Sequence, residues 1–187
     1  TPAMRPGNQY AVGKCGLDAA GYFYANYYGM KIIRTRFFTH TGDRRTMGSA
    51  EVNFARQIAK IELGLQPPIV KHGNLNSVRT WADVKDAVRA YYLLSQKGVP
   101  GEVYNIGGTT NKTIGEMLDF MISKSFVEGI KKELDPTLVR KVDVNLQIVD
   151  TSKFQEATGY KFEIPFEETI LDVLDFWREK IKKDGAE

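Results

Sequence analysis

A helix that leads directly into a strand is the feature that most limits how this chain can fold. Residues 10–28 contain no proline and are rich in Ala, Tyr and Phe, which predicts one long helix. Gly29 then supplies a helix C-terminal stop, and residues 31–38 carry the β-branched and aromatic side chains of a buried strand. The order helix, tight turn, strand predicts an α/β fold.

The same alternation continues along the chain. Apolar residues at helical spacing alternate with short apolar runs, and Thr113 with Glu116 forms a capping-box pattern that opens one of the helices. This order favours a mostly parallel α/β sheet. Helices are expected over 50–63, 83–96, from 113, 151–159 and 165–183, and strands over 68–71, 77–81, 103–106 and 142–149.

Three of these helices carry an apolar stripe that we expect to face the core. The stripes are Val52, Ala55, Ile58, Ala59 and Leu63; Val84, Ala87, Val88, Tyr91 and Leu94; and Ile170, Val173, Leu174 and Trp177.

Composition excludes several classes of protein. The 187 residues are 42% hydrophobic and carry a net charge of only +3 without a basic block, so neither disorder nor nucleic-acid binding is indicated. A single cysteine, Cys15, allows no internal disulfide, and no metal-ligand spacing or membrane-spanning run is present. We expect a globular cytoplasmic protein, and the initial Thr1 suggests a trimmed or partly observed one.

Tyr10 and Lys14 are the first candidate site residues. Side chains four apart project from one helix face, and a nearby ammonium favours the phenolate form of tyrosine, as proton transfer requires. Taken alone, such a pair is more often an ordinary part of an amphipathic helix. A polar, glycine-containing loop over 39–49 follows a strand and is a candidate binding loop. No Gly-rich turn joins a strand to a helix, so this chain alone could not cradle a dinucleotide in the usual way.

Several ordered motifs together resemble one family, the extended short-chain dehydrogenases/reductases, in the branch with GDP-mannose 4,6-dehydratase and GDP-4-keto-6-deoxy-mannose reductase. The resemblance covers essentially the whole chain. The motifs that carry it are Tyr10-Ala-Val-Gly-Lys14, Phe38-Thr-His-Thr-Gly-Asp-Arg-Arg45, Gly73-Asn-Leu-Asn-Ser-Val-Arg-Thr-Trp81, Asp83-Val-Lys-Asp86, Gly101-Glu-Val-Tyr-Asn-Ile-Gly107 and Leu138-Val-Arg-Lys-Val-Asp143.

The resemblance implies a domain organisation. Residues 1–38 would end a Rossmann-like domain, and 39–187 would be mainly a sugar-nucleotide-binding region, with 102–107 a strand of the Rossmann sheet. A nucleotide-binding half with the Gly-rich turn and a catalytic Ser or Thr would precede them. The implied cofactor is NADP(H) or NAD(H), and the implied partners are a GDP-linked sugar and further copies in a homodimer or homotetramer, without nucleic acid or membrane.

The resemblance also implies roles for individual residues. Tyr10 would be the acid/base at the sugar C4 oxygen, and Lys14 would hold the nicotinamide ribose and depress the Tyr10 pKa. His40 and Arg45 would contact the cofactor. Implied substrate residues are Thr39, Asn53, Gly73, Asn74, Arg79, Arg140 and Asp143.

Structural alternatives stand beside these roles. His40 could be a hydrogen-bonded structural residue, Arg45 solvated charge, Gly73 a turn requirement, and Arg140 an ion-pair partner of Asp143. Thr39 also departs from the family pattern, which usually has Asn there.

The implied function is an NADP(H)-dependent sugar-nucleotide enzyme, a lyase or oxidoreductase. A dehydratase would convert GDP-mannose to GDP-4-keto-6-deoxy-mannose. The alternatives are the reductase of that product, another NAD-dependent epimerase or dehydratase, or a noncatalytic nucleotide-sugar-binding module.

Overall fold

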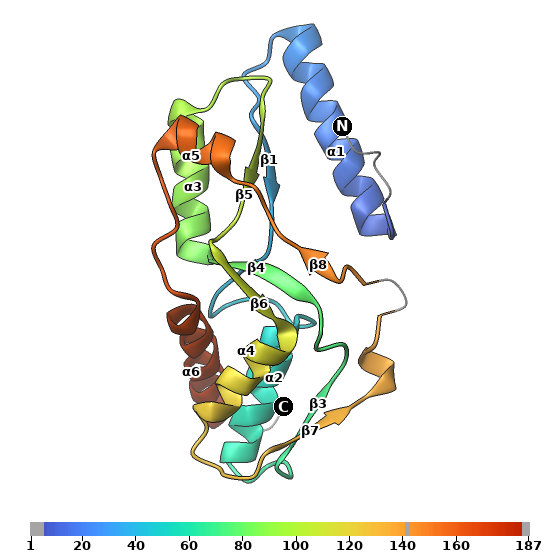
Figure 1. Ribbon diagram of the computed structural model, residues 1–187, viewed down its shortest axis with the longest axis vertical. Helices are drawn as coiled ribbons and strands as arrows, with labels where there is room; N and C mark the ends of the chain where they lie inside the picture. The colour runs from blue at the N-terminus through green and yellow to red at the C-terminus, as the bar shows by residue number, and fades with distance from the viewer. Residues whose placement is uncertain (1–5, 141–142, 185–187) are drawn as a thin grey trace. The chain divides into compact units, whose positions relative to one another are not determined.

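The computed structural model describes residues 6–140 and 143–184, which form two compact units. Figure 1 gives the order of helices and strands. Unit 1 consists of Thr1–Phe37, Val88–Ile106 and Val149–Lys161, and unit 2 consists of Phe38–Ala87, Gly107–Ile148 and Phe162–Glu187. Residues 1–38 and the strand at 102–107 were expected together, and unit 1 combines nearly these residues with residues 88–101 and 149–161.

Unit 1 is built on a helix and a pair of parallel strands. Helix α1 (Gln9–Tyr28) begins where the Asn8 side chain accepts a hydrogen bond from the Ala11 amide, and it ends at Gly29 with φ of 65°. Both ends match the expectation from sequence. Strand β1 (Arg34–Phe37) pairs in parallel with β5 (Val103–Ile106), which confirms the strand expected at 103–106. Helices α3 (Val84–Lys97), which begins in unit 2, and α5 (Ser152–Thr158) complete this unit.

Unit 2 contains two small sheets. Strand β4 (Val78–Asp83) is parallel to β2 (His40–Thr41) and β8 (Leu146–Gln147) and antiparallel to β6 (Thr110–Thr113). Strand β3 (Ile69–His72) pairs in parallel with β7 (Lys131–Leu134). The α/β class is confirmed and pairing is mostly parallel, although it is divided among small sheets.

Three helices form the core of unit 2. Helices α2 (Ala50–Glu62), α4 (Ile114–Ser123) and α6 (Phe166–Asp184) pack against one another, as Figure 1 shows, and a short 3₁₀ helix, η1 (Pro136–Leu138), follows β7. The α6 stripe is buried as expected. So are four expected residues of α2, namely Val52, Ala55, Ile58 and Ala59.

Other expectations about burial and strand length were wrong. Leu63 is exposed because it lies past the end of α2. On α3 the buried stripe is Ala87, Ala90 and Leu94, whereas Val88 and Tyr91 point away from it and are exposed. The strand expected over 142–149 is reduced to the two residues of β8, and its first residue, Val142, lies outside the described residues.

The capping box of α4 forms as predicted. The Glu116 amide donates to Thr113 Oγ1 at 2.9 Å, and the Thr113 amide donates to Glu116 Oε2 at 2.7 Å. Hydrogen bonds from the Thr113 backbone and side chain to the Glu116 carboxylate lower the pKa of Glu116. Among the described residues, no helix combines the length and apolar character needed to cross a bilayer.

Candidate functional site

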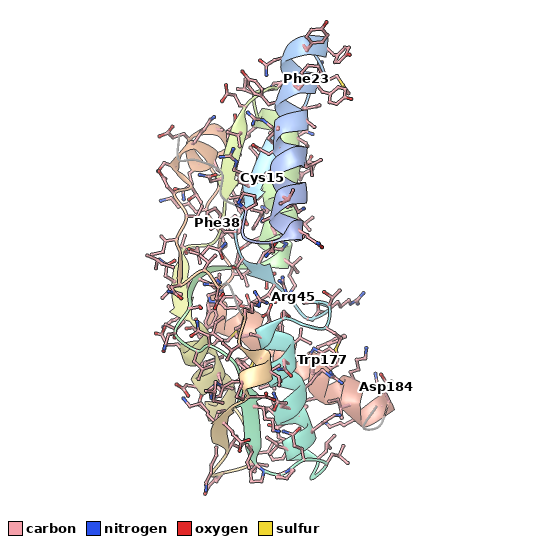
Figure 2. The ribbon with its side chains drawn as sticks, turned by 90° about the vertical axis from the view of Figure 1, so that its right-hand side faces the viewer. Cys15, Phe23, Phe38, Arg45, Trp177 and Asp184 are labelled. Carbon is pink, nitrogen blue, oxygen red and sulfur yellow. The ribbon has the colours of Figure 1, made fainter. Side chains whose placement is uncertain are left out.

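Helix α1 brings Tyr10 and Lys14 together as the spacing predicts. The Lys14 ammonium nitrogen is 5.4 Å from the centroid of the Tyr10 ring, a cation–π distance. Tyr10 is 74% exposed, and none of the described residues of α1 is buried. Figure 2 shows the side chains along this helix, including Cys15 and Phe23. The phenol and the ammonium can therefore both reach a ligand from one side of the helix.

A second group of predicted residues meets around the Asp143 carboxylate in unit 2. Oδ2 of Asp143 accepts hydrogen bonds from Ser77 Oγ at 2.7 Å and from Asn74 Nδ2 at 3.0 Å. Oδ1 accepts from Arg79 Nη2 at 3.1 Å. We call Asn74, Ser77, Arg79 and Asp143 the Asp143 cluster. Asn74, Arg79 and Asp143 were predicted as site residues; Ser77 was not.

The electrostatics of the Asp143 cluster favour a charged carboxylate. Burial acts to raise the pKa of Asp143, but hydrogen bonds from Ser77 and Asn74 and the charge of Arg79 outweigh it, and the pKa is lowered. The Arg79 side chain is only 13% exposed. Its Nη1 donates to the carbonyl oxygens of Val144 at 2.6 Å and Val78 at 2.9 Å. The guanidinium is thus held in one orientation from two sides.

Asp143 forms an ion pair with Arg79. From the sequence, Arg140 was considered as a possible ion-pair partner of Asp143. Arg140 is exposed in the structure, so its side chain is accessible to a ligand.

Gly73 follows β3, where the chain passes close to η1. A Cβ atom at this position would lie 2.9 Å from the carbonyl carbon of Leu138 and closer still to its oxygen. Close backbone approach, rather than an unusual φ, therefore explains why glycine occupies this position.

The loop after β2 forms a third group, around the buried carboxylate of Glu51. Thr41 Oγ1 donates to Glu51 Oε1 at 2.9 Å, and Arg45 Nε lies 2.8 Å from the same oxygen. Arg45 also donates to the carbonyl oxygen of His40. Glu51 is 3% exposed, and sequence reasoning missed it because an acidic residue in the first turn of a helix is common. Arg45 thus has an internal counterion, although its side chain remains 36% exposed.

The other predicted residues near this loop also make hydrogen bonds within the protein. His40 Nδ1 lies 3.1 Å from the carbonyl oxygen of Phe38. Thr39 Oγ1 donates to Gln147 Oε1 at 3.2 Å, and Asn53 Oδ1 accepts from Gln57 at 3.4 Å. These contacts place Thr39 beside β8 and Asn53 on the first half of α2.

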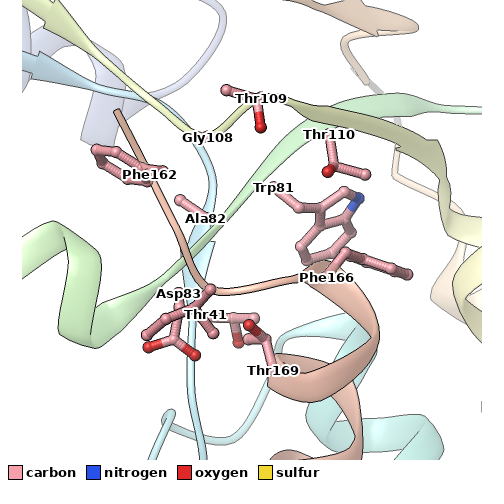
Figure 3. Close-up of a pocket in the computed structure, with 11 residues that line it drawn as sticks. Thr41, Trp81, Ala82, Asp83, Gly108, Thr109, Thr110, Phe162, Phe166 and Thr169 are labelled. Atoms are coloured by element: carbon pink, nitrogen blue, oxygen red, sulfur yellow. The ribbon is translucent and has the colours of Figure 1, made fainter. Parts of the chain in front are cut away.

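A small cavity of about 10 Å³ in unit 2 is lined in part by Thr41 of the Glu51 group, and Figure 3 shows it. The rings of Trp81 and Phe166 lie on one side of it, and Thr41, Asp83 and Thr169 lie on another. This volume is about that needed for one water molecule. The cavity is therefore too small for a substrate.

Metal binding finds no support in the part of the chain that the structure describes. Within residues 6–140 and 143–184, no three His, Cys, Asp or Glu side chains are grouped so that they could hold an ion.

Comparison with known proteins identifies relatives along nearly the whole chain. GDP-6-deoxy-D-mannose reductase of Pseudomonas aeruginosa is 26% identical over 96% of this chain and 59% of the relative. GDP-mannose 4,6 dehydratase 2 of Arabidopsis thaliana is 28% identical over 98% of this chain and 49% of the relative. The chain therefore spans about half to three fifths of the length of these relatives.

Solved structures share the fold. The structure of RMD from Pseudomonas aeruginosa complexed with NADPH matches 94% of this chain and 58% of its own, with a TM-score of 0.87 and 26% identity. A dTDP-glucose 4,6-dehydratase from Bacillus anthracis in complex with NAD covers 97% of this chain and 55% of its own, with a TM-score of 0.81 and 21% identity. The family model described as GDP-mannose 4,6 dehydratase matches residues 1–173. The chain belongs to the GDP-mannose 4,6 dehydratase family of extended short-chain dehydrogenases/reductases.

Proposed function

We propose that this chain is the catalytic-helix and sugar-nucleotide-binding part of an NADP(H)-dependent enzyme that dehydrates GDP-mannose. The observation that carries the proposal is the Tyr10–Lys14 pair, with ring and ammonium 5.4 Å apart on one helix of a chain that belongs to this family. Unit 1 would end the nucleotide-binding domain, and unit 2 would bind the sugar nucleotide. A homodimer or homotetramer remains a prediction.

Tyr10 and Lys14 would have different roles near the reacting sugar carbon. The nicotinamide, when bound, supplies the hydride chemistry. Tyr10 would move a proton at the C4 oxygen of the sugar, and Lys14 would donate to the hydroxyls of the nicotinamide ribose and favour the phenolate. Both side chains are exposed donors on one helix, which fits this half of the cofactor. A further part of the enzyme would have to bind the cofactor diphosphate, because no Gly-rich turn occurs in this sequence.

The Asp143 cluster would bind the diphosphate and ribose of the substrate. The hydrogen bonds to Val78, Val144 and Asp143 use three of the five N–H donors of Arg79, so up to two can donate to a phosphate oxygen. Because Asp143 and two backbone carbonyls orient this guanidinium, little conformational freedom would be lost on binding. Asn74 lies in the same cluster and could serve a ribose or a base. His40, Arg45, Thr39, Asn53, Gly73 and Arg140 would complete the cofactor and substrate contacts.

The substitution Tyr10→Phe tests the proposal in the full-length protein that contains this chain. Removing the phenolic oxygen should lower kcat for GDP-mannose by at least about 100-fold, because general acid/base catalysis typically contributes that much or more. Affinity for the sugar nucleotide, measured by calorimetry, should change by less than about twofold since the ring remains. Tyr27→Phe is the matched control, because Tyr27 is exposed on the same helix. Full turnover by Tyr10→Phe would reject the assigned role.

A reductase is the second candidate, since the relative from Pseudomonas aeruginosa that matches 96% of this chain has that name. The two activities differ in substrate. Turnover of GDP-mannose without added reductant indicates a dehydratase, whereas consumption of NADPH with GDP-4-keto-6-deoxy-mannose indicates a reductase. Sugar-nucleotide binding without either reaction would indicate the noncatalytic module.

A further inference from the structure

Arg34 of β1 is enclosed by three residues of α1. Its Nη1 lies 3.5 Å from Asp18 Oδ2, and its guanidinium carbon is 5.0 Å from the centroid of the Tyr22 ring. The third residue is Gly21, and a Cβ atom there would lie 3.1 Å from Arg34 Cγ and 3.3 Å from Cδ. Positions 18, 21 and 22 follow the i, i+3, i+4 spacing of one helix face. Asp18, Gly21 and Tyr22 therefore form a binding site on α1 for the Arg34 side chain, which we call the seat.

Asp18 and Arg34 are both largely withdrawn from solvent. The side chain of each is 14% exposed. Asp18 Oδ2 also accepts from Arg36 Nη2 at 2.8 Å, so one carboxylate joins α1 to two arginines of β1. Arg34 Nη2 donates to the carbonyl oxygen of Gly101 at 3.2 Å, next to the start of β5. These polar contacts connect α1 to β1, and β1 to the turn before β5.

This attachment matters because none of the described residues of α1 is buried. On the side of α1 that carries Asp18, the other partly buried residues are Ala11, Cys15, Gly21 and Ala25, whose side chains are small or absent. Such residues offer few packed atoms against rotation, so the polar contacts of Asp18 contribute to the orientation of α1 on the strands of unit 1.

The seat and the Tyr10–Lys14 pair share one side of α1. With 3.6 residues per turn, each residue advances by about 100° around the axis, so Tyr10, Lys14, Asp18 and Gly21 fall within an arc of about 80°. A rotation that displaced Asp18 from Arg34 would turn Tyr10 and Lys14 by the same angle.

We propose that Asp18 and Arg34 are positioning residues: their contact, with Gly21 leaving space for it, fixes the rotation of α1 and hence the direction in which Tyr10 and Lys14 project. The reaction served is the one proposed above. Neither residue touches the reacting atoms. Their effect on turnover comes through Tyr10, whose proton transfer is sensitive to displacement, since an error of about 1 Å in a reacting group can cost about 100-fold in rate.

The test compares Asp18→Asn, Asp18→Glu and Gly21→Ala with wild type in the full-length protein. Asp18→Asn removes the charge and should lower kcat by at least about tenfold, while KM for the sugar nucleotide stays within about twofold. The pH profile of kcat should also shift, because Tyr10 and Lys14 change their relation to the substrate. Asp18→Glu, which keeps the charge, should recover at least half of the lost kcat. Gly21→Ala should give a smaller loss, because its Cβ displaces Arg34 by only a few tenths of an ångström.

Glu102→Gln is the control. This substitution removes a carboxylate that pairs with Lys153 Nζ at 2.5 Å in the same unit. The side chains of Glu102 and Lys153 are both half-exposed. Its kcat should equal that of wild type. The proposal is overturned if Asp18→Asn keeps wild-type kcat, or if kcat falls only in proportion to the folded fraction measured by circular dichroism.

Amide hydrogen exchange separates failure of this inference from failure of the proposed function. Exchange over residues 10–28 should be faster in Asp18→Asn than in Glu102→Gln, whereas exchange over α6 should not differ. If the wild-type protein turns over neither substrate, the proposed function fails, and the positioning contact is then tested by hydrogen exchange alone. Faster exchange of α1 in Asp18→Asn than in Glu102→Gln supports the contact, and equal exchange overturns it.

Discussion

At the scale of single residues, the candidate site depends on carboxylates that hold arginines. Asp143 orients Arg79, and Glu51 pairs with Arg45. The spacing of Tyr10 and Lys14 could be read from sequence because helix geometry alone brings them together. Ser77 could not be linked to Asp143 in this way, since the two lie 66 residues apart and meet only through tertiary folding.

Asp143 should make the stability of the protein depend on pH. Its folded pKa is lowered from 3.8, so the carboxylate stabilises the fold fully above the unfolded pKa, and this stabilisation is lost as pH falls through the folded pKa. Asp143→Asn should therefore flatten the decline of the unfolding free energy below about pH 5 and cost about 2 kcal/mol at pH 7, because Arg79 loses its charged partner. Urea melts from pH 7 to pH 3 measure both effects.

Asp172→Asn is the matched control for Asp143→Asn. Asp172 pairs with Lys85 at 3.0 Å, but the two side chains are 43% and 63% exposed. Solvent screens an exposed pair, so this variant should keep nearly the wild-type pH dependence. If the two variants had the same pH dependence, Asp143 would not have the role assigned to it.

At the scale of helices and strands, the elements that carry their own sequence signals were predicted most accurately. Helices α1 and α6 were predicted nearly to the residue, because Gly29 ends a proline-free α1 and a 3.6-residue apolar period marks α6 locally. Strand β6 has the sequence Thr-Asn-Lys-Thr and β7 has Lys-Lys-Glu-Leu, without apolar alternation. Their strand conformation comes from pairing with β4 and β3, which a single local segment does not encode.

Arg178 connects the three core helices of unit 2. Its Nε and Nη2 lie 2.8 and 2.6 Å from the two carboxylate oxygens of Glu62 on α2, and Nη2 also donates to the Lys124 carbonyl, just after α4, at 2.8 Å. The Glu62 side chain is 2% exposed. Arg178→Met leaves this buried carboxylate without its partner, and we expect a loss of about 3 kcal/mol in the free energy of unfolding, measured by urea denaturation at pH 7.

Lys182 provides the matched control, and Glu62 provides a second variant. Lys182→Met removes an exposed pair with Glu179 on the same helix and should cost less than about 1 kcal/mol. The double substitution Glu62→Gln with Arg178→Met should be less destabilising than the sum of the two single changes, because the unpaired charge is gone. Strict additivity would show that the pair contributes no coupling.

At the scale of the whole molecule, the chain passes between the two units repeatedly. Unit 1 is assembled from three separate segments, with boundaries at Phe37, Val88, Ile106, Val149 and Lys161. Neither unit is a continuous stretch, so no single cut separates them. Composition does not mark these crossings, so apart from the strand at 102–107 no segment after residue 38 was expected in the first domain.

The two units differ in how much apolar surface they bury. Most of the buried hydrophobic residues lie in unit 2, whereas unit 1 buries a smaller set that includes Leu94, Tyr104 and Phe154, and none of the described residues of α1 is buried. Apolar burial is the main stabilising contribution to folding, so we expect unit 1 of the 187-residue chain to unfold at a lower urea concentration than unit 2. Both tryptophans, Trp81 and Trp177, are buried in unit 2 and report on that unit alone.

Unfolding followed by two probes should therefore give two midpoints. Tryptophan fluorescence should show one late transition, and far-ultraviolet circular dichroism should show earlier loss of helix, with α1 contributing 20 residues to the first phase. Limited proteolysis at the intermediate urea concentration should cleave within residues 10–28 and spare α2 and α6. Coincident transitions by both probes would mean that the units unfold cooperatively, because the burial within unit 2 would then stabilise α1 as well.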